Sequence, residues 1–337
     1  MTWQKQLKGD SLTWLLEAGP PGVRYLALRD LLDAPAGDRQ LVSAREAVTT
    51  QGPAATILSA MHAKGYWVKP GPGYTQRYRS TVWSLIALSQ LGARVDMDER
   101  IGRACGYLLD HALTGGGQFG VKGTPETTVD CLQGNLCAAL LDLGCQDPRL
   151  EAAYDWMARS VTGEDVASAD DLQTAVRYYP WKCGPLFTCR FNGMLPCAWG
   201  AVKVMLALGK LPAGQRTPLI ERAIQAGADF LLSVDPASAR YPTRRGARPN
   251  PTWWKFGFPV FYVTDLLQNI EVLVGLGYGK DARLRPALDL VLGKQDSQGR
   301  WKMESGYAGK VWGDYGVLDQ PNPWVTLRAL RVLKEVG

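Results

Sequence analysis

The chain has 337 residues, 46% of them apolar, with 38 lysines and arginines against 32 aspartates and glutamates, a net charge of +6. This length and apolar content allow a large buried core, and the weak, scattered positive charge argues against a nucleic-acid-binding protein. The N-terminus lacks the apolar run of a secretory signal, and the most apolar window, near 256–278, is interrupted by four polar residues, Asp265, Gln268, Asn269 and Glu271, so we expect no membrane span.

Hydrophobic periodicity predicts helices throughout and no sustained period-two alternation, so we expect an all-α protein. Two short helices are expected at 11–17 and 23–32, separated by a Gly-Pro-Pro-Gly break. The later helices are expected at 38–49, 54–63, 80–91, 98–112, 128–143, 148–160, 197–208, 217–234, 260–276, 282–294 and 324–335. Pro196 and Pro259 lie at or near predicted helix starts, and Asn322-Pro323 supplies an N-cap followed by the first helical residue.

One pattern recurs along the chain: an apolar helix end, a glycine, an acidic residue and a second helix. Its clearest copy is 273–301, and weaker copies cover 87–109, 139–157 and 206–232. Repetition at this period predicts stacked helical hairpins around one core. We therefore expect a single domain, 1–337, built of units near 11–66, 67–119, 120–181, 182–253 and 254–337. The alternative is that glycine ends unrelated helices.

The links between helices are alternately short and long. The long ones are 66–79, 114–127, 162–195, 236–258 and 297–322, and this alternation places them all at one end of the array, together with the helix starts that follow them. Loops 66–79 and 236–258 carry basic residues and no acid: Lys69, Arg77, Arg79, Arg240, Arg244, Arg245, Arg248 and Lys255. We expect a basic mouth there, where helix N-termini also favour an anion. Aromatic residues gather in the same loops, which indicates either an apolar ligand pocket or packing of loops against helices.

The segment Gln295-Asp-Ser-Gln-Gly299-Arg-Trp301 resembles the QW motif of squalene and oxidosqualene cyclases. Gly65-Tyr-Trp67 and Gly115-Gly-Gly-Gln-Phe119 resemble degenerate copies. In those enzymes the motif joins an outer helix to the next inner helix of an α/α toroid, a fold shared by protein prenyltransferase β subunits. The resemblance covers roughly 80–335 and implies a single (α/α)6 toroid around a central cavity, without a sizeable sheet. Five hairpins and one helix from each terminus would close the ring.

The chemistry of these families transfers only in part. The cyclases protonate a polyene with an Asp-x-Asp-Asp motif, which this sequence lacks. Asp265, on a predicted inner helix, is the candidate acid, with a paired or capping role as the alternative. Protein prenyltransferases hold zinc with Asp, Cys and His near inner-helix starts; Asp130-Cys131 occupies a comparable place, but no histidine matches.

Four of the seven cysteines are expected at the same rim, Cys131 and Cys197 at inner-helix starts and Cys183 and Cys189 in the longest loop. Without a secretory signal we expect reduced thiols in the cytoplasm. A helix N-terminus lowers a thiol pKa, so we expect Cys131 and Cys197 to favour the thiolate. Four thiolates would hold structural zinc, and Asp130 in place of one cysteine would leave an open catalytic position. An iron–sulfur cluster would use the same ligands, and packing of small buried residues is the remaining alternative.

The leading functional hypothesis is an isoprenoid-type enzyme, related to terpene cyclases or prenyltransferases, with a prenyl chain in an aromatic cavity and a diphosphate at a basic mouth. The expected binding residues are Arg77, Arg79, Trp83, Arg244, Arg245, Trp253, Trp254, Lys255 and Tyr262. The rival hypothesis is a non-catalytic toroid that grips a protein or peptide, with the cysteines holding a structural metal. Peripheral contact with a membrane is compatible with the basic, aromatic loops. A glycan-processing toroid would need paired carboxylates, which the sequence does not place.

Overall fold

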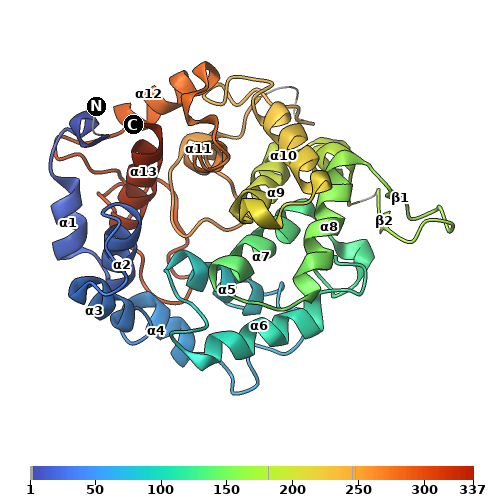
Figure 1. Ribbon diagram of the computed structural model, residues 1–337, viewed down its shortest axis with the longest axis horizontal. Coiled ribbons are helices and arrows are strands. Elements are labelled where there is room, and N and C mark those ends of the chain that lie inside the picture. Colours follow the sequence, from blue (N-terminus) through green and yellow to red (C-terminus); the bar gives the residue numbers. More distant parts are fainter. Residues whose placement is uncertain (1–2, 181, 245, 247) are drawn as a thin grey trace.

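Two concentric rings of helices form the molecule in the computed structural model, which describes residues 3–180, 182–244, 246 and 248–337. Figure 1 looks down the ring axis. The inner helices are α2 (Pro21–Asp30), α5 (Thr81–Gln90), α7 (Asp130–Asp142), α9 (Ala198–Lys210), α11 (Leu266–Gly275) and α13 (Pro323–Val336). The outer helices are α1 (Ser11–Ala18), α3 (Arg39–Val48) with α4 (Gly52–Ser59), α6 (Glu99–Ala112), α8 (Arg149–Thr162), α10 (Pro218–Leu231) and α12 (Arg285–Gly293). The predicted all-α (α/α)6 toroid is confirmed.

The two rings differ in how apolar residues are distributed. Outer helix α6 buries Ile101, Ala104, Cys105, Leu108 and Leu109 along one stripe and exposes the opposite face. This spacing of three and four residues is that of an amphipathic surface helix. Inner helix α7, in contrast, is buried on all sides from its first residue to Leu140. A helix that is apolar nearly all round belongs in a core, so the residue pattern itself indicates whether a helix lies in the inner or the outer ring.

Short strands and 3-10 helices occupy only the loops. In the described part of the chain, β1 (Ala167–Ser168) pairs in parallel with β2 (Arg177–Tyr178), and β3 (Cys183–Gly184), β4 (Thr188–Cys189) and β5 (Leu195–Pro196) form an antiparallel sheet. The 3-10 helices are Trp3–Gln6, Pro125–Thr127, Pro185–Phe187, Arg190–Asn192, Ala213–Gln215, Pro251–Trp254, Tyr278–Lys280 and Ala282–Leu284. No helix among the described residues is long and apolar enough to cross a membrane.

Glycine–aromatic turns connect outer to inner helices with one shared geometry. The indole Nε1 of Trp301 donates to the carbonyl of Val291 in α12 (2.8 Å), and its backbone N–H donates to Thr326 Oγ1 in α13 (2.9 Å). Trp67 makes the corresponding bonds: Nε1 to the carbonyl of Ile57 in α4 (2.7 Å) and N–H to Thr81 Oγ1 in α5 (3.2 Å). Both indoles are fully buried. Each aromatic residue therefore fastens the end of an outer helix to the start of the next inner helix.

Glycine is required in these turns because the residue two places before each aromatic side chain has a left-handed backbone. Gly65 has φ +93° and Gly299 has φ +71°, and Gly117, which precedes Phe119 by the same two residues, has φ +85°. A Cβ at these positions is strained. At Gly299 it would also lie 3.0 Å from the carbonyl oxygen of Gly9.

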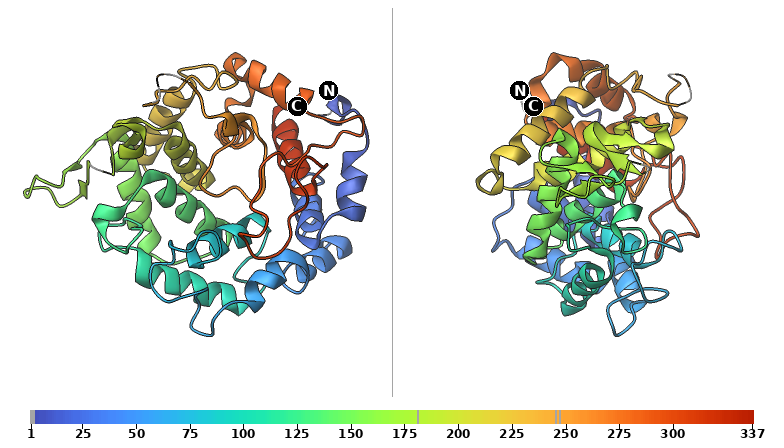
Figure 2. Two further views of the ribbon diagram at one scale, coloured as in Figure 1. Left: turned by 180° about the vertical axis from the view of Figure 1, so that it is seen from behind. Right: turned by 90° about the vertical axis from the view of Figure 1, so that its right-hand side faces the viewer.

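The N- and C-terminal segments close the ring, as predicted. Helix α13 packs against α2, and the backbone N–H of Lys8 donates to Gln295 Oε1 (3.1 Å). The ion pair of Lys334 with Asp33 (2.6 Å) joins the two ends of the chain across this junction. Figures 1 and 2 show the two termini side by side.

The long loops lie together on one side of the ring, as expected, and the short turns lie on the other (Figure 2). Loops far apart in sequence contact one another there: the N–H of Tyr78 donates to the carbonyl of Lys310 (3.2 Å), and the N–H of Glu304 donates to the carbonyl of Phe256 (2.7 Å). The largest error among the predicted boundaries is the start of α11. Helix α11 begins at Leu266 rather than near Pro259, because the side chain of Asp265 caps it by accepting the N–H of Gln268 (2.7 Å). Asn322 caps α13 as predicted.

Candidate functional site

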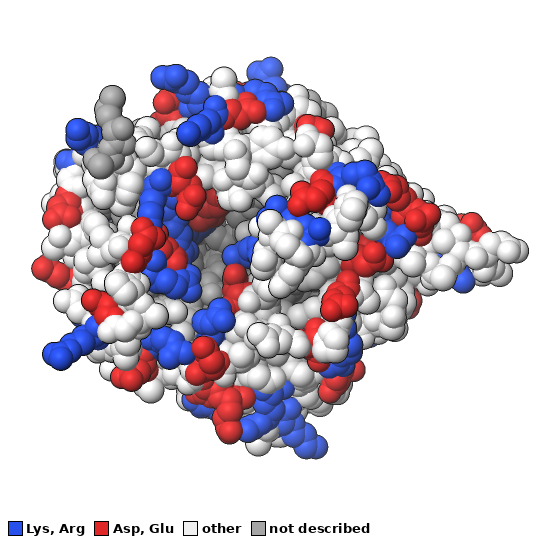
Figure 3. All heavy atoms as spheres, in the orientation of Figure 1, with Lys and Arg blue, Asp and Glu red and all other residues white. Residues whose placement is uncertain are grey.

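A central cavity of about 710 Å³ lies inside the inner ring. All six inner helices contribute to it, mostly with residues of their C-terminal halves, from Leu26 on α2 to Val332 on α13. The cavity therefore opens on the side of the short turns, and Figure 3, which views that side, shows the hollow at the centre of the ring. Its apolar wall is formed by Leu26, Ile86, Ala138, Ala139, Met205, Leu206, Phe258, Val260, Val272, Val274 and Val332.

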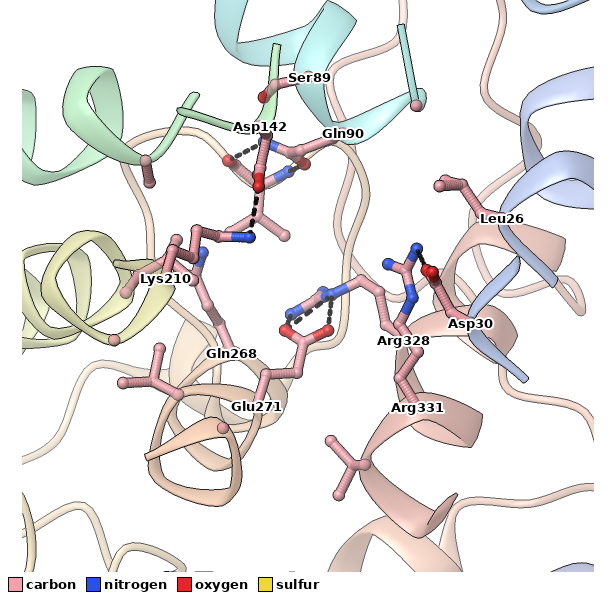
Figure 4. Close-up of a pocket in the computed structure, with 18 of the residues that line it drawn as sticks. Leu26, Asp30, Ser89, Gln90, Asp142, Lys210, Gln268, Glu271, Arg328 and Arg331 are labelled. Carbon is pink, nitrogen blue, oxygen red and sulfur yellow. Dashed lines mark hydrogen bonds and ion pairs between the residues drawn. The ribbon is translucent and has the colours of Figure 1, made fainter. Parts of the chain in front are cut away.

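The floor of the cavity is a buried ion network centred on Arg328 of α13. Its guanidinium binds Asp265 (2.9 Å) and Glu271 (2.7 Å) and donates to the carbonyl of Gly257 (2.8 Å). Arg328 and Asp265 side chains are each 6% exposed, and that of Glu271 is 21% exposed. Figure 4 shows Glu271 and Arg328 facing each other at the cavity wall. Guanidinium–carboxylate pairs of this kind hold the start of α11 against α13.

Lys203 of α9 lies directly behind this floor. Its side chain is fully buried, and its ammonium donates to Oε1 of Gln268, which lines the cavity. Burial lowers the pKa of Lys203 to about 7, because removing an ammonium from water disfavours its charged form. Near neutral pH this lysine is therefore close to its titration midpoint, one side chain away from the cavity.

The rim of the cavity carries cations held by carboxylates. Arg331 binds Asp30, and Lys210 binds Asp142 (2.8 Å) on the opposite side of the opening (Figure 4). Burial raises the pKa of Asp30, but the charges of Arg331 and Arg29 more than offset it, so the pKa lies below its ordinary value. Arg94 and Lys334 also line the cavity near this rim. An anion reaching the opening meets several guanidinium and ammonium groups.

The loop end of the ring is filled by aromatic side chains, which we call the aromatic plug: Tyr74, Tyr78, Trp83, Phe261 and Tyr307. The ring of Tyr78 stacks on Phe261 (5.1 Å between centroids) and meets Tyr307 edge-on (4.4 Å). Trp83 and Phe261 are fully buried. Of the two interpretations of the loop aromatics, packing of loops against helices describes these five.

None of the predicted binding residues that the structure describes lines the 710 Å³ cavity, and Trp83 belongs to the aromatic plug at the loop end. Arg77 donates to the hydroxyl of Tyr74 (2.7 Å), and its guanidinium lies over the ring of Tyr262 (5.5 Å to the centroid). Arg79 donates to the carbonyls of Gly309 (3.0 Å) and Val311 (3.2 Å). These two arginines thus fasten loop 66–79 in place.

The other members of the set have structural contacts or lie at the surface. The indole of Trp253 donates to the carbonyl of Pro236 (3.0 Å) and that of Trp254 to the carbonyl of Ala237 (2.7 Å). Arg244 and Lys255 are exposed. Arg245 lies outside the described residues. A ligand-binding role for the whole set stays a prediction.

Asp265 has the paired and capping role that the sequence offered as the alternative to a catalytic acid. Its Oδ1 accepts from the N–H of Gln268 (2.7 Å) and from Arg328, and its Oδ2 accepts from the N–H of Gly257 (3.1 Å) and from Arg328. A carboxylate engaged on both oxygens has no free position for a substrate. These contacts therefore do not favour a catalytic role for Asp265.

Asp130 and the four cysteines predicted as metal ligands lie near one another at the starts of α7 and α9 and in the sheet β3–β5, but no three of them stand where they could hold an ion together. Asp130 is the first residue of α7, 6% exposed, and burial raises its pKa to about 8, so it keeps its proton at neutral pH. Cys183 donates to the carbonyl of Thr128 (3.6 Å) and interacts with the Asp130 carboxyl. Cys189 and Cys197 share a hydrogen bond.

The expected thiolate character of Cys131 and Cys197 is wrong. Burial raises the pKa of Cys131 to about 12, and the hydrogen bond to Cys189, together with burial, raises the pKa of Cys197. The cost of burying a thiolate exceeds the gain from the helix N-terminus. The lowered pKa belongs instead to Cys189, at about 6, because Cys197 donates to it.

Sequence reasoning missed the charged residues that line the cavity, Lys210, Glu271, Arg328 and Arg331, and Lys203 behind its floor. Their signal was present, since Lys203 interrupts an otherwise apolar segment, Ala198–Leu208, and Arg328 lies in a helix buried over most of its length. A charge on an inner helix has to be paired or to face a cavity.

No protein-family model and no curated protein matches the chain. Solved structures match at 12% identity. The type II terpene cyclase MstE from Scytonema without ligand aligns over 87% of this chain and 97% of its own, with a TM-score of 0.32. A variant of that cyclase with geranylgeranyl dihydroxybenzoate as substrate aligns over 88% of this chain and 97% of its own, with a TM-score of 0.34. A variant with merosterolic acid A as product aligns over 87% of this chain and 96% of its own, with a TM-score of 0.33. At this identity and these TM-scores the matches assign no substrate and no residue role.

Proposed function

We propose that the protein is an isoprenoid-type enzyme, of the terpene cyclase or prenyltransferase kind, which holds a prenyl chain in the central cavity. The observation that carries the proposal is the cavity itself: about 710 Å³, open at the short-turn end, with an apolar face formed by side chains of the inner helices and charged and polar groups at its rim and floor. Ligand sites commonly have volumes of about 300–1,000 Å³, apolar walls and a few placed polar groups. An extended prenyl chain is complementary to such a wall in shape and polarity.

We place the head group of that compound at the rim rather than at the loop end. The aromatic plug lies between the cavity and the loops that carry Arg77 and Arg79, whereas Arg331, Lys210 and Lys334 line the cavity at its opening. Because their carboxylate partners are partly exposed, these cations can exchange a carboxylate for a diphosphate or another acidic head.

The deep polar groups bear on the type of reaction. Asp265 and Glu271 are both engaged by Arg328, so the floor offers no free acid in the described part of the chain to protonate a double bond. This favours binding and head-group chemistry over acid-initiated cyclisation.

The rival function, a module that grips a protein partner, is favoured by one observation. The sheet β3–β5 and its turns expose large apolar side chains, with Leu186 51%, Phe191 56%, Met194 45% and Leu195 39% exposed. Clustered exposed apolar residues mark contact surfaces. This surface lies on loop 162–195, away from the cavity.

Direct binding of a fluorescent geranylgeranyl or farnesyl diphosphate tests the cavity assignment. We expect Ala139→Trp, which fills the cavity from α7, to weaken binding at least tenfold. The matched control is Ala152→Trp on the exposed face of α8, which we expect to leave affinity within twofold. Undetectable binding by the native protein, or equal affinity in both variants, contradicts the proposal.

A second pair of variants locates the head group. Lys210→Ala with Lys334→Ala is expected to lower the affinity for the diphosphate at least fivefold, and Arg77→Ala with Arg79→Ala to leave it within twofold. The opposite result places the anion at the loop end, as the sequence suggested.

A further inference from the structure

Asp130 and Cys197 both border a position that has no side chain. Gly200, in the first turn of α9, lies between them: a Cβ added there would be 3.2 Å from Asp130 Cβ, 3.8 Å from Asp130 Oδ2 and 3.9 Å from Cys197 Cβ. The starts of α7 and α9 therefore bring a carboxyl group and a thiol to one small space, and glycine keeps that space open.

The sheet formed by β3, β4 and β5 adds two more thiols. Cys183 and Cys189 are direct cross-strand partners, so their side chains lie on one face. Cys189 is also opposite Leu195, and Cys197 follows Leu195 by two residues and has an extended backbone. Because alternate residues of a strand share a face, Cys197 lies diagonally beside Cys189 on that same face. One side of this sheet thus presents three thiols towards the starts of α7 and α9.

One oxygen of the carboxyl group in this cluster lacks a partner. Asp130 Oδ2 is buried, with no hydrogen-bond partner among the described residues. A buried polar oxygen without a partner costs about 1–3 kcal/mol, so a fold that keeps one next to three thiols has a use for it.

We propose that Asp130, Cys183, Cys189 and Cys197 form a binding site for one thiophilic divalent cation, with Zn²⁺ as the reference ion. Thiolates with one carboxylate suit tetrahedral zinc, and the cation supplies the partner that Asp130 Oδ2 lacks. The sequence left two ligand sets open: four cysteines, or three cysteines with Asp130. The structure favours the set with Asp130, because the thiol of Cys131 is paired with the hydroxyl of Tyr262.

The cluster is not a preformed cage. In the described part of the chain no three Cys, His, Asp or Glu side chains already stand where they could hold an ion together. Binding therefore requires side-chain rotation and the release of thiol protons, so the affinity falls as the pH is lowered.

The test is Zn²⁺ and Co²⁺ titration of the purified full-length protein, with a competing chromophoric chelator and with thiol counting. We expect one equivalent of Zn²⁺ per chain, protection of three thiols, and thiolate-to-cobalt charge-transfer absorption with Co²⁺. Asp130→Asn and Cys197→Ser are expected to lower the Zn²⁺ affinity at least tenfold. Cys131→Ser and Cys105→Ala, a cysteine on outer helix α6, are expected to change it less than twofold.

Three results overturn the proposal. The first is a native protein that binds no Zn²⁺ at micromolar concentration and whose thiols react equally with and without the ion, a result that needs no variant to fold. The second is loss of binding in Cys131→Ser with retention in Asp130→Asn, which assigns the ion to the four cysteines instead. A Cys189–Cys197 disulfide that forms in place of metal binding also counts against the site.

Discussion

Replacing Arg328 by methionine tests whether the ion network at the cavity floor holds the inner ring together. The change keeps an unbranched, though shorter, side chain but leaves Asp265 and Glu271 without their cation and the carbonyl of Gly257 without its donor. Breaking a buried ion pair from one side costs about 3–5 kcal/mol. Here the lower end applies, since Asp265 keeps its bonds from the N–H groups of Gly257 and Gln268, and Glu271 is partly open to the cavity. We expect Arg328→Met to lower the free energy of unfolding by about 3 kcal/mol.

The assay is urea unfolding followed by tryptophan fluorescence and circular dichroism, which also reports whether the transition is two-state. The control is Arg331→Met, about one helical turn away in α13. It breaks the ion pair with Asp30, in which the side chains of Arg331 and Asp30 are 32% and 20% exposed. More exposed pairs contribute about 1 kcal/mol or less. If Arg328→Met costs no more than Arg331→Met, the reasoning about the buried network is refuted.

Two further predictions concern the buried lysine and the repeated turns. Because the folded-state pKa of Lys203, about 7, is below the ordinary lysine value of 10.5, the unfolded chain binds the extra proton. The penalty of burying the charge therefore declines as the pH rises from 7 to 10.5. The stability advantage of Lys203→Met over the native protein should therefore shrink by about 2–3 kcal/mol between pH 7 and pH 9 in urea unfolding; an advantage independent of pH would contradict this. Trp67→Phe and Trp301→Phe each lose the indole bond to an outer-helix carbonyl and should each cost about 1–3 kcal/mol, and widely different costs would show that the two turns are not equivalent.

Helix order and ring closure could be predicted from the sequence because they follow from local patterns. Apolar stripes on the outer helices, continuous apolar runs on the inner ones and glycine-aromatic turns are all visible in the chain itself. The start of α11 was misplaced because Pro259 looked like a first helical residue, whereas the better cap is Asp265, six residues later. A capping side chain that accepts an N–H outweighs a favourable proline.

The location of the cavity could not be predicted in the same way. The loops are rich in aromatic and basic residues, a composition typical of a ligand site, but these side chains satisfy one another: Tyr78 packs on Phe261 and Arg79 binds loop carbonyls. The residues that line the cavity are single charges on apolar helices, and their partners are distant in sequence, as Glu271 is from Arg328. Convergence of the cysteines was predictable from the helix starts, but the effect of burial on their pKa values was not.

Photoaffinity labelling with a benzophenone-bearing prenyl diphosphate, followed by peptide mapping, tests the central claim most directly. A chain that enters from the short-turn end should label α9 near Met205 and Leu206 and α11 near Val272, and unlabelled prenyl diphosphate should suppress this labelling. Labelling confined to loops 66–79 and 236–258, or labelling that the unlabelled compound does not reduce, would contradict binding in the central cavity.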